Sequence, residues 1–384
     1  MRVIIPETIT DAMLTSTTAA EPGVGEAAWA SGTTYAAGDR AILGSPSHTA
    51  TISNASPAVV TWTAHGLPDG TPVVLTTTGT LPAGLTAGQV YYVIRRATDT
   101  FQLSETLDGA PVSTTSAGSG THTATAQVHR IYESQAASNT GNPPAIDDGT
   151  KWIDIGPTNR WACLDTLRNT RTWADSPLEV VLTPGVRVNS IALLGLVADS
   201  VTIEKTSGGD TVFSETVDLV TREVLNWYDY FFEEFTTKES VVRFTLPPYS
   251  DGDITVTITR AVGNAACGAL VIGNYVDLGD AEIGAQGDAR NFSTIDRDTF
   301  GNAVLVPRRS IPTVKVRTWF DKSAAKKIMD ARAELNAVPA VWTTLDEDDD
   351  GWFEPLIILG VYKTFSVNAS QTEKGSADIE AEEI

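Results

Sequence analysis

The chain is poor in the residues that build metal centres and disulfide frameworks. Its 384 residues include 2 cysteines and 4 histidines. Cys163 and Cys267 stand far apart in the sequence and show no motif spacing. We therefore interpret both as buried apolar thiols, and not as metal ligands or as a disulfide framework.

Positive charge is also scarce. The 48 acidic residues stand against 27 basic ones, which gives a formal net charge of −21. A surface of this sign repels a phosphate backbone, and the sequence holds no basic stripe for one to follow. We therefore expect no nucleic acid among the partners.

Long apolar runs are missing as well. No stretch approaches the length that crosses a membrane. The opening residues, MRVIIPETIT, contain one Arg and a short apolar run that Pro6 interrupts, which is too little for a signal sequence. From this we expect a soluble protein that is made in the cytoplasm and does not insert into membranes.

The sequence is rich in the residues that separate short strands. It has 31 glycines, 19 prolines and many threonines, which favour strands joined by turns over long helices. Its length also exceeds what one hydrophobic core usually supports. We predict a mainly β, multidomain protein with small β modules, a β-sandwich or jelly-roll-like domain, and a C-terminal β domain with one helix.

Two separated segments complete one pattern when the residues between them are removed. Residues 29–43 contain two aromatic residues and a Gly-Asp turn, and residues 131–156 contain two more aromatic residues around a Pro-Pro pair. This order resembles the small chitin-binding type of carbohydrate-binding module, grouped as families five and twelve. The resemblance implies a module core built from Trp29, Tyr35, Tyr132 and Trp152.

The resemblance also implies a split domain, formed by residues 1–47 and 129–160. Chitin-binding members stack sugars on an exposed aromatic pair shortly after the tyrosine that corresponds to Tyr132. Here Tyr132 is followed by Glu-Ser-Gln-Ala-Ala-Ser, without an aromatic residue. We therefore expect the scaffold of the module without its stacking platform.

The stretch between the two segments has its own pattern of strands and turns. It contains His65-Gly-Leu, Tyr91-Tyr-Val-Ile and Thr100-Phe-Gln-Leu. This series resembles the small β-barrel repeat that phage structural proteins share with the first catalytic cysteine half-domain of ubiquitin-activating enzymes. No cysteine lies in the segment, so the resemblance implies the scaffold without ligase chemistry. We predict an inserted small β-barrel over residues 48–128.

Residues 161–273 show short alternating runs between turns, which is typical of a sandwich or jelly roll. Within them lies an aromatic concentration, Trp227-Tyr-Asp-Tyr-Phe-Phe. One interpretation is a glycan-binding face, to which Trp227, Tyr228 and Tyr230 would contribute. We favour the other, a core strand with a loop anchored under the sandwich, because large aromatic side chains dominate protein cores.

Residues 274–384 hold the one helix that the sequence predicts. It runs over residues 321–336, where Asp321 or Ser323 can cap the start and Ile328 and Leu335 share a face. Strands are expected on both sides of it. This order resembles the C-terminal region common in tail and tail-tip proteins of siphophages, and implies an α+β tail-assembly domain.

Few residues are candidates for chemistry. None of the histidines lies in a Gly-x-Ser-x-Gly context, and His65 belongs to a turn, where we expect its side chain to bond to its own loop. The acidic residues offer many carboxylate pairs for a glycosidase, but no spacing singles one out. We expect no catalytic residues, no cofactor and no enzymatic activity.

One segment meets the first part of a calcium-binding loop. Asp346, Asp348 and Asp350 occupy its first, third and fifth positions and a glycine follows, but the twelfth position is Ile357 in place of the expected Glu. We favour the alternative, a solvated hairpin turn whose acids protect a sheet edge from aggregation.

The three resemblances meet naturally in a phage tail. Together they imply a structural component of a bacteriophage tail tip or baseplate. It would be found in the virion as a homo-oligomeric trimer or hexamer ring that contacts other phage tail proteins and displays its small modules towards the host. An alternative is a tail protein that binds or depolymerises host surface polysaccharide. A third, an accessory domain of a secreted chitinase, is weakened by the absence of both a signal sequence and the aromatic pair.

Overall fold

A computed structural model of the protein describes residues 1–21, 27–107, 109–221, 226–232, 235–282, 284–297, 299–344, 356–368 and 373–384. As predicted, the protein is mainly β, with 49% strand and 7% helix. It divides into two compact units. Unit 1 contains Met1–Ile9, Ser16–Ala19 and Ala162–Ile384, and unit 2 contains Thr10–Thr15 and Ala20–Trp161.

Six strands of unit 2 close into a barrel in the order β10-β7-β6-β11-β8-β9. They are β6 (Ser47–Ile52), β7 (Val60–Thr61), β8 (Pro72–Thr77), β9 (Val90–Ile94), β10 (Thr100–Ser104) and β11 (His122–Ala126). Burial alternates along the strands, so that Tyr91, Phe101 and Leu75 fill the interior. Closure pairs the strand edges with each other and encloses this core.

The remaining strands of unit 2 form two small sheets. Four of them pair in the order β14-β12-β5-β3, namely β3 (Ala27–Ala28), β5 (Arg40–Leu43), β12 (Arg130–Ser134) and β14 (Trp152–Pro157). The other sheet joins β4 (Thr34–Tyr35) to β13 (Asn139–Thr140), and the 3-10 helix η1 (Pro144–Ile146) follows. The chain leaves β5 for the barrel at Leu43 and re-enters the sheet at Arg130, and these two residues are register partners. The barrel is therefore inserted between two adjacent strands.

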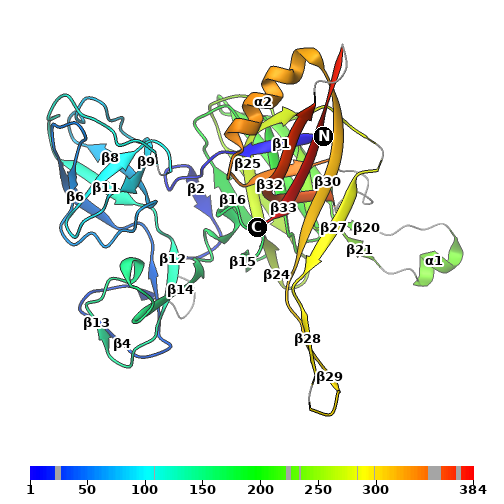
Figure 1. Ribbon diagram of the computed structural model, residues 1–384, viewed down its shortest axis with the longest axis horizontal. Helices are drawn as coiled ribbons and strands as arrows, with labels where there is room; N and C mark the ends of the chain where they lie inside the picture. The colour runs from blue at the N-terminus through cyan, green and yellow to red at the C-terminus, as the bar shows by residue number, and fades with distance from the viewer. Residues whose placement is uncertain are drawn as a thin grey trace. The chain divides into compact units, whose positions relative to one another are not determined.

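Unit 1 is organised around a ten-stranded sheet (Figure 1). Across the sheet the strands are β22 (Ser240–Arg243), β17 (Ser190–Leu194), β25 (Ala269–Asp277), β1 (Arg2–Pro6), β31 (Ala340–Thr343), β32 (Ile357–Asn368), β33 (Lys374–Glu383), β30 (Ser310–Asp321) and β26 (Asp280–Ala281), with β27 (Gln286–Asn291) also paired to β30. Every residue of β17 is buried. Burial on both faces explains why its apolar run does not alternate.

Two predicted domain boundaries differ from this arrangement. The boundary expected between residues 273 and 274 falls inside β25. β1, which the sequence placed in the split module, pairs with both β25 and β31 in the middle of the large sheet. Val3 and Ile4 are fully buried there. Sheet pairing joins segments that are distant along the chain, and a local strand-and-turn pattern does not reveal which strands pair.

A second sheet of unit 1 has five strands in the order β19-β18-β23-β16-β2. They are β2 (Leu14–Thr17), β16 (Leu178–Leu182), β18 (Ser200–Ser207), β19 (Asp210–Asp218) and β23 (Ile254–Thr259). β18 and β23 alternate buried and half-buried residues, which matches the period of a strand with one covered face.

Three two-stranded ladders complete the strands of unit 1 that the structure describes. They pair β15 (Thr172–Asp175) with β24 (Asn264–Cys267), β20 (Val220–Thr221) with β21 (Thr236–Thr237), and β28 (Thr294–Arg297) with β29 (Ala303–Val306). The 3-10 helix η2 (Ala162–Leu164) precedes β15.

The predicted C-terminal helix is present as α2 (Ala325–Glu334), after the 3-10 helix η3 (Lys322–Ala324). Ile328 and Leu335 are buried in the core of the large sheet. The predicted cap is wrong, because neither Asp321 nor Ser323 makes a side-chain capping hydrogen bond and η3 occupies the entry instead. Among the described residues, no helix is both long and apolar enough to cross a membrane.

Candidate functional site

The structure gathers the four aromatic residues of the proposed module core into one small cluster. Tyr35, Tyr132 and Trp152 are buried, and Trp29 packs against them partly buried. The rings of Tyr35 and Trp152 meet edge to face with centroids 5.0 Å apart, and Trp152 Nε1 donates a hydrogen bond to the carbonyl oxygen of Asn142 at 2.9 Å. Three of the four rings are thus enclosed by the protein, which leaves them no face for stacking on a sugar.

The aromatic segment of unit 1 corrects the interpretation that the sequence favoured. Trp227–Phe232 forms a short helix, α1, and not a core strand. Trp227, Tyr228 and Tyr230 are all exposed, Trp227 by 79%. The rings contact one another instead of a core, for example Tyr228 and Phe232 with centroids 4.9 Å apart. The segment instead forms a local helical hydrogen bond, from the N–H of Tyr230 to the carbonyl oxygen of Asn226 at 3.1 Å. Apolar composition alone does not distinguish a helix from a strand.

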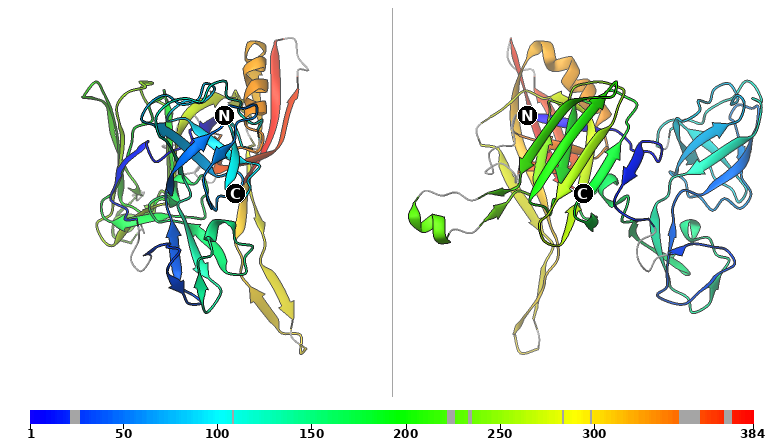
Figure 2. Two further views of the ribbon diagram at one scale, coloured as in Figure 1. Left: turned by 90° about the vertical axis from the view of Figure 1, so that its left-hand side faces the viewer. Right: turned by 180° about the vertical axis from the view of Figure 1, so that it is seen from behind.

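A second apolar projection of unit 1 was not predicted from the sequence. The hairpin of β28 and β29 extends away from the large sheet in both views (Figures 1 and 2). It exposes Ile295, Phe300 and Leu305, and Phe300 is 90% exposed. β28 pairs only with β29 among the described strands, so each has an unpaired outer edge. The signal in the sequence was the Gly-Asn turn of Phe300-Gly-Asn, followed by the short apolar run Ala-Val-Leu-Val.

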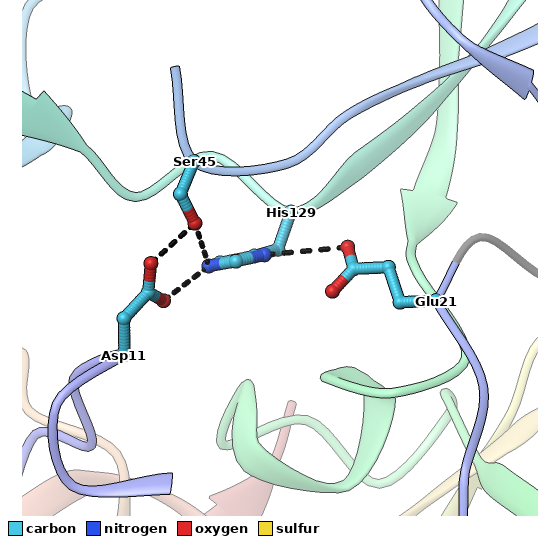
Figure 3. A network of polar contacts seen from close by, with 4 residues as sticks. All are labelled: Asp11, Glu21, Ser45 and His129. Atoms are coloured by element: carbon cyan, nitrogen blue, oxygen red, sulfur yellow. Dashed lines mark hydrogen bonds and ion pairs between the residues drawn. The ribbon is translucent and has the colours of Figure 1, made fainter. Parts of the chain in front are cut away.

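The most concentrated polar site lies inside unit 2, around His129 (Figure 3). Nε2 of His129 is 2.6 Å from Oδ1 of Asp11, and Nδ1 is 3.3 Å from Oε1 of Glu21. The imidazole also stacks on Trp161, with ring centroids 4.1 Å apart. Ser45 completes the group, because its hydroxyl donates to Oδ2 of Asp11 and lies 3.3 Å from Nε2.

The positive charge of His129 and the negative charges of Asp11 and Glu21 stabilise one another. Burial opposes the charge on His129, but hydrogen bonds to Asp11 and Glu21 outweigh it and raise the pKa of the imidazole. Burial likewise opposes the carboxylates, but hydrogen bonds from His129 lower the pKa of both Asp11 and Glu21. The nearby Arg160 acts in the same direction on both acids.

The order Ser45, His129, Glu21 resembles a nucleophile, a base and an orienting acid, but the geometry does not activate the serine. Nε2 carries its proton towards Asp11 and has no lone pair to receive the Ser45 proton. Ser45 directs its own proton to Asp11. The cluster is therefore a buried ion-pair network. It connects Asp11 and Glu21 to the two segments that join the four-stranded sheet to the barrel. Ser45 lies in the first of these segments, between β5 and β6, and His129 lies in the second, between β11 and β12.

His65 behaves as the sequence predicted. The backbone N–H of Leu67 donates to its Nδ1 at 3.0 Å, so Nε2 carries the proton and donates to the carbonyl oxygen of Ala97 at 2.8 Å. Both ring nitrogens are thereby used within the barrel. Nδ1 therefore serves the loop of the histidine itself, as predicted, and Nε2 connects that loop to the turn between β9 and β10, which the sequence did not predict.

The remaining candidates do not provide a ligand-binding site among the described residues. Asp346, Asp348 and Asp350 lie outside the described residues. No group of three metal-ligating side chains occurs in the part of the chain that the structure describes. An open groove of about 420 Å³ in unit 1 is lined by charged residues that already pair, including Arg317 with Asp378 at 2.6 Å and Lys315 with Glu380 at 3.4 Å.

Comparisons with known proteins identify no relative. No protein-family model, curated protein or solved structure matches the chain. The carbohydrate-module, barrel and siphophage resemblances therefore stay predictions from the sequence.

Proposed function

We propose that the chain is a structural component of a bacteriophage tail tip or baseplate. Copies of it assemble into a symmetric ring of three or six, in contact with other phage tail proteins, and display the small β modules of unit 2 towards the host surface. The protein resides in the virion and acts by mechanical assembly and adhesion. The proposal assigns it no catalytic step and no cofactor.

One observation carries this proposal, the exposure of apolar side chains on the β28–β29 hairpin. Ile295, Phe300 and Leu305 are exposed, and the hairpin that carries them extends away from the sheet (Figure 1). Contiguous exposed apolar side chains mark sites of protein interaction, and burying each contributes about 1.5–3 kcal/mol. The net charge of −21 keeps such a protein soluble before it assembles.

Sedimentation of the purified full chain over a range of concentrations tests the proposal. We expect assembly into a closed ring, visible by electron microscopy. Substituting Phe300 and Leu305 with Ser should raise the dissociation constant at least tenfold, about 1.4 kcal/mol. The matched control is Val262→Ser, because Val262 is 82% exposed in the turn between β23 and β24 and is not part of the hairpin. A wild-type chain that stays monomeric at all concentrations, alone and with tail proteins, would contradict the proposal.

The exposure of α1 favours a second candidate, the binding of host surface polysaccharide. Trp227, Tyr228 and Tyr230 present accessible rings, and exposed aromatic rings are the groups on which sugars stack. Isothermal titration calorimetry with host polysaccharide tests it. Trp227→Ala should abolish binding, whereas Tyr249→Ala, an exposed aromatic outside α1, should not. Equal binding by both variants would reject α1 as the site.

A further inference from the structure

The two cysteines of unit 1 lie close together in the fold, although they are far apart in the sequence. Cys163 is in η2 and Cys267 ends β24. The backbone N–H of Cys163 donates to Oγ1 of Thr172 at 2.9 Å, and Thr172 is the register partner of Cys267. Thr172 thus links the two cysteines, which are neighbours in the core of unit 1 although they lie on elements that are distant in the sequence.

Both thiols are reduced and enclosed. The exposed fractions of Cys163 and Cys267 are 1% and 0%, and neither is in a disulfide. Interaction with Cys267 lowers the pKa of Cys163, and Thr172 adds to this effect. Interaction with Cys163 and burial raise the pKa of Cys267. We therefore assign the first attack to Cys163.

We propose that Cys163 and Cys267 form a redox pair that a small disulfide, such as oxidised glutathione, converts to an intramolecular disulfide. The thiolate of Cys163 attacks one sulfur of glutathione disulfide, whose S–S bond breaks and releases one glutathione thiolate. Cys267 then gives its proton to solvent, attacks the Cys163 sulfur of the mixed disulfide and releases the second glutathione. The two cysteines lose two electrons in total, and glutathione disulfide gains them.

The new bond would tie η2 to β24 within unit 1. It would close a loop of about 100 residues, and cross-links over long loops constrain the unfolded chain most. Because both thiols are buried, exchange requires either a local opening or formation during folding. In a reducing compartment the pair would therefore remain as thiols, and in an oxidising compartment it would form the disulfide.

Refolding of the full chain in glutathione buffer tests the proposal. The chain is unfolded in guanidinium, refolded with oxidised and reduced glutathione or with dithiothreitol, and then alkylated under denaturing conditions. We expect the glutathione sample to be monomeric, with no alkylated cysteine and a peptide that links Cys163 to Cys267. Its melting temperature should exceed that of the dithiothreitol sample by roughly 5 °C or more. Cys163→Ser and Cys267→Ser are the matched controls, and neither can form the linked peptide.

A second measurement tests the proposal without unfolding the protein, in case the chain does not refold. The folded protein is incubated with oxidised glutathione at increasing temperatures below its melting point, and the linked peptide is measured with time. Its appearance in a monomeric chain supports the pair. Two alkylated cysteines after prolonged incubation, or disulfides formed only between chains, would overturn it.

Discussion

The barrel of unit 2 and the β28–β29 hairpin of unit 1 are both made of short antiparallel strands, yet they treat their apolar residues in opposite ways. The barrel pairs its strand edges with each other and encloses Tyr91 and Phe101. The hairpin leaves its outer edges unpaired and exposes Phe300 and Leu305. The strands of the barrel cover their apolar side chains within the chain, whereas the hairpin leaves its apolar side chains exposed, and the proposed assembly would cover them.

Matched substitutions of phenylalanine test this contrast most strongly. Phe101, which is 1% exposed, fills the barrel, so Phe101→Ala should lower the free energy of unfolding of unit 2 by about 3–5 kcal/mol. Phe300→Ala should change the stability of the monomeric chain by about 0.5 kcal/mol or less, because the ring already contacts water. Urea denaturation of both variants gives the comparison. Similar losses in the two variants would mean that the hairpin side chain is buried in the monomer.

The His129 cluster stabilises unit 2 through buried ion pairs, whereas the barrel core does so through apolar contacts. Removing its cation should have the next largest effect on the free energy of unfolding. His129→Gln leaves Asp11 and Glu21 without their shared cation, which should cost roughly 3 kcal/mol of stability. The control is His48→Gln, because His48 is exposed on β6. Equal stability of the two variants would show that the carboxylates do not depend on His129.

The difference between wild type and His129→Gln should depend on pH. The pKa of His129 is raised, so its contribution is complete below the ordinary value of 6.5 and is lost as the pH rises through the higher folded value. The pKa values of Asp11 and Glu21 are lowered, so their contribution is present above the ordinary values of 3.8 and 4.5 and is lost as the pH falls through the lower folded values. The stability difference should therefore be largest between pH 4.5 and 6.5. A difference that stays constant from acid to alkaline pH would contradict this account.

Excision of the barrel should have a smaller effect on the rest of the chain. Residues 48–128 connect strands that already pair at Leu43 and Arg130, so a short Gly-Ser linker can replace them. Loop closure costs only about 0.6 kcal/mol per doubling of loop length, so we expect the remainder to keep its stability within about 1 kcal/mol. The excised segment should unfold cooperatively by itself, as measured by circular dichroism. An insoluble remainder would show that the barrel contributes to the fold around it.

Calcium should have no effect. The loop from Asp346 to Gly351 lacks the acidic residue at its twelfth position, where Ile357 stands. A chelator and added calcium should therefore give the same melting temperature. A rise of several degrees with calcium would show that the ion binds the folded state, since a ligand stabilises the state that it binds.

Local patterns in the sequence predicted much of the fold. Alternation identified β18 and β23, and the three- and four-residue spacing of Ile328 and Leu335 identified α2. The position of β1 was missed, because Val3 pairs with Trp342 at the other end of the chain. α1 was missed because a run of five aromatic residues and one aspartate fits a strand and a helix equally well.

The candidate site was predicted less well than the fold, for the same physical reason. His129 meets Asp11 and Glu21 from more than a hundred positions away. Cys163 and Cys267 come together only because β15 and β24 pair. Each of these contacts depends on tertiary pairing, which residue spacing does not encode. By contrast His65, whose partner Leu67 is two residues away, was interpreted correctly.

Amide hydrogen exchange of the hairpin, in dilute solution and in the assembled ring, tests the central claim most directly. Residues 294–306 should exchange rapidly in the monomer and become protected in the assembly, because the proposed partner would cover the outer edges of β28 and β29. The barrel amides, which are already paired within the chain, should exchange equally slowly in both samples. Rapid exchange of the hairpin in the assembled ring would contradict the claim that this arm is completed by a partner.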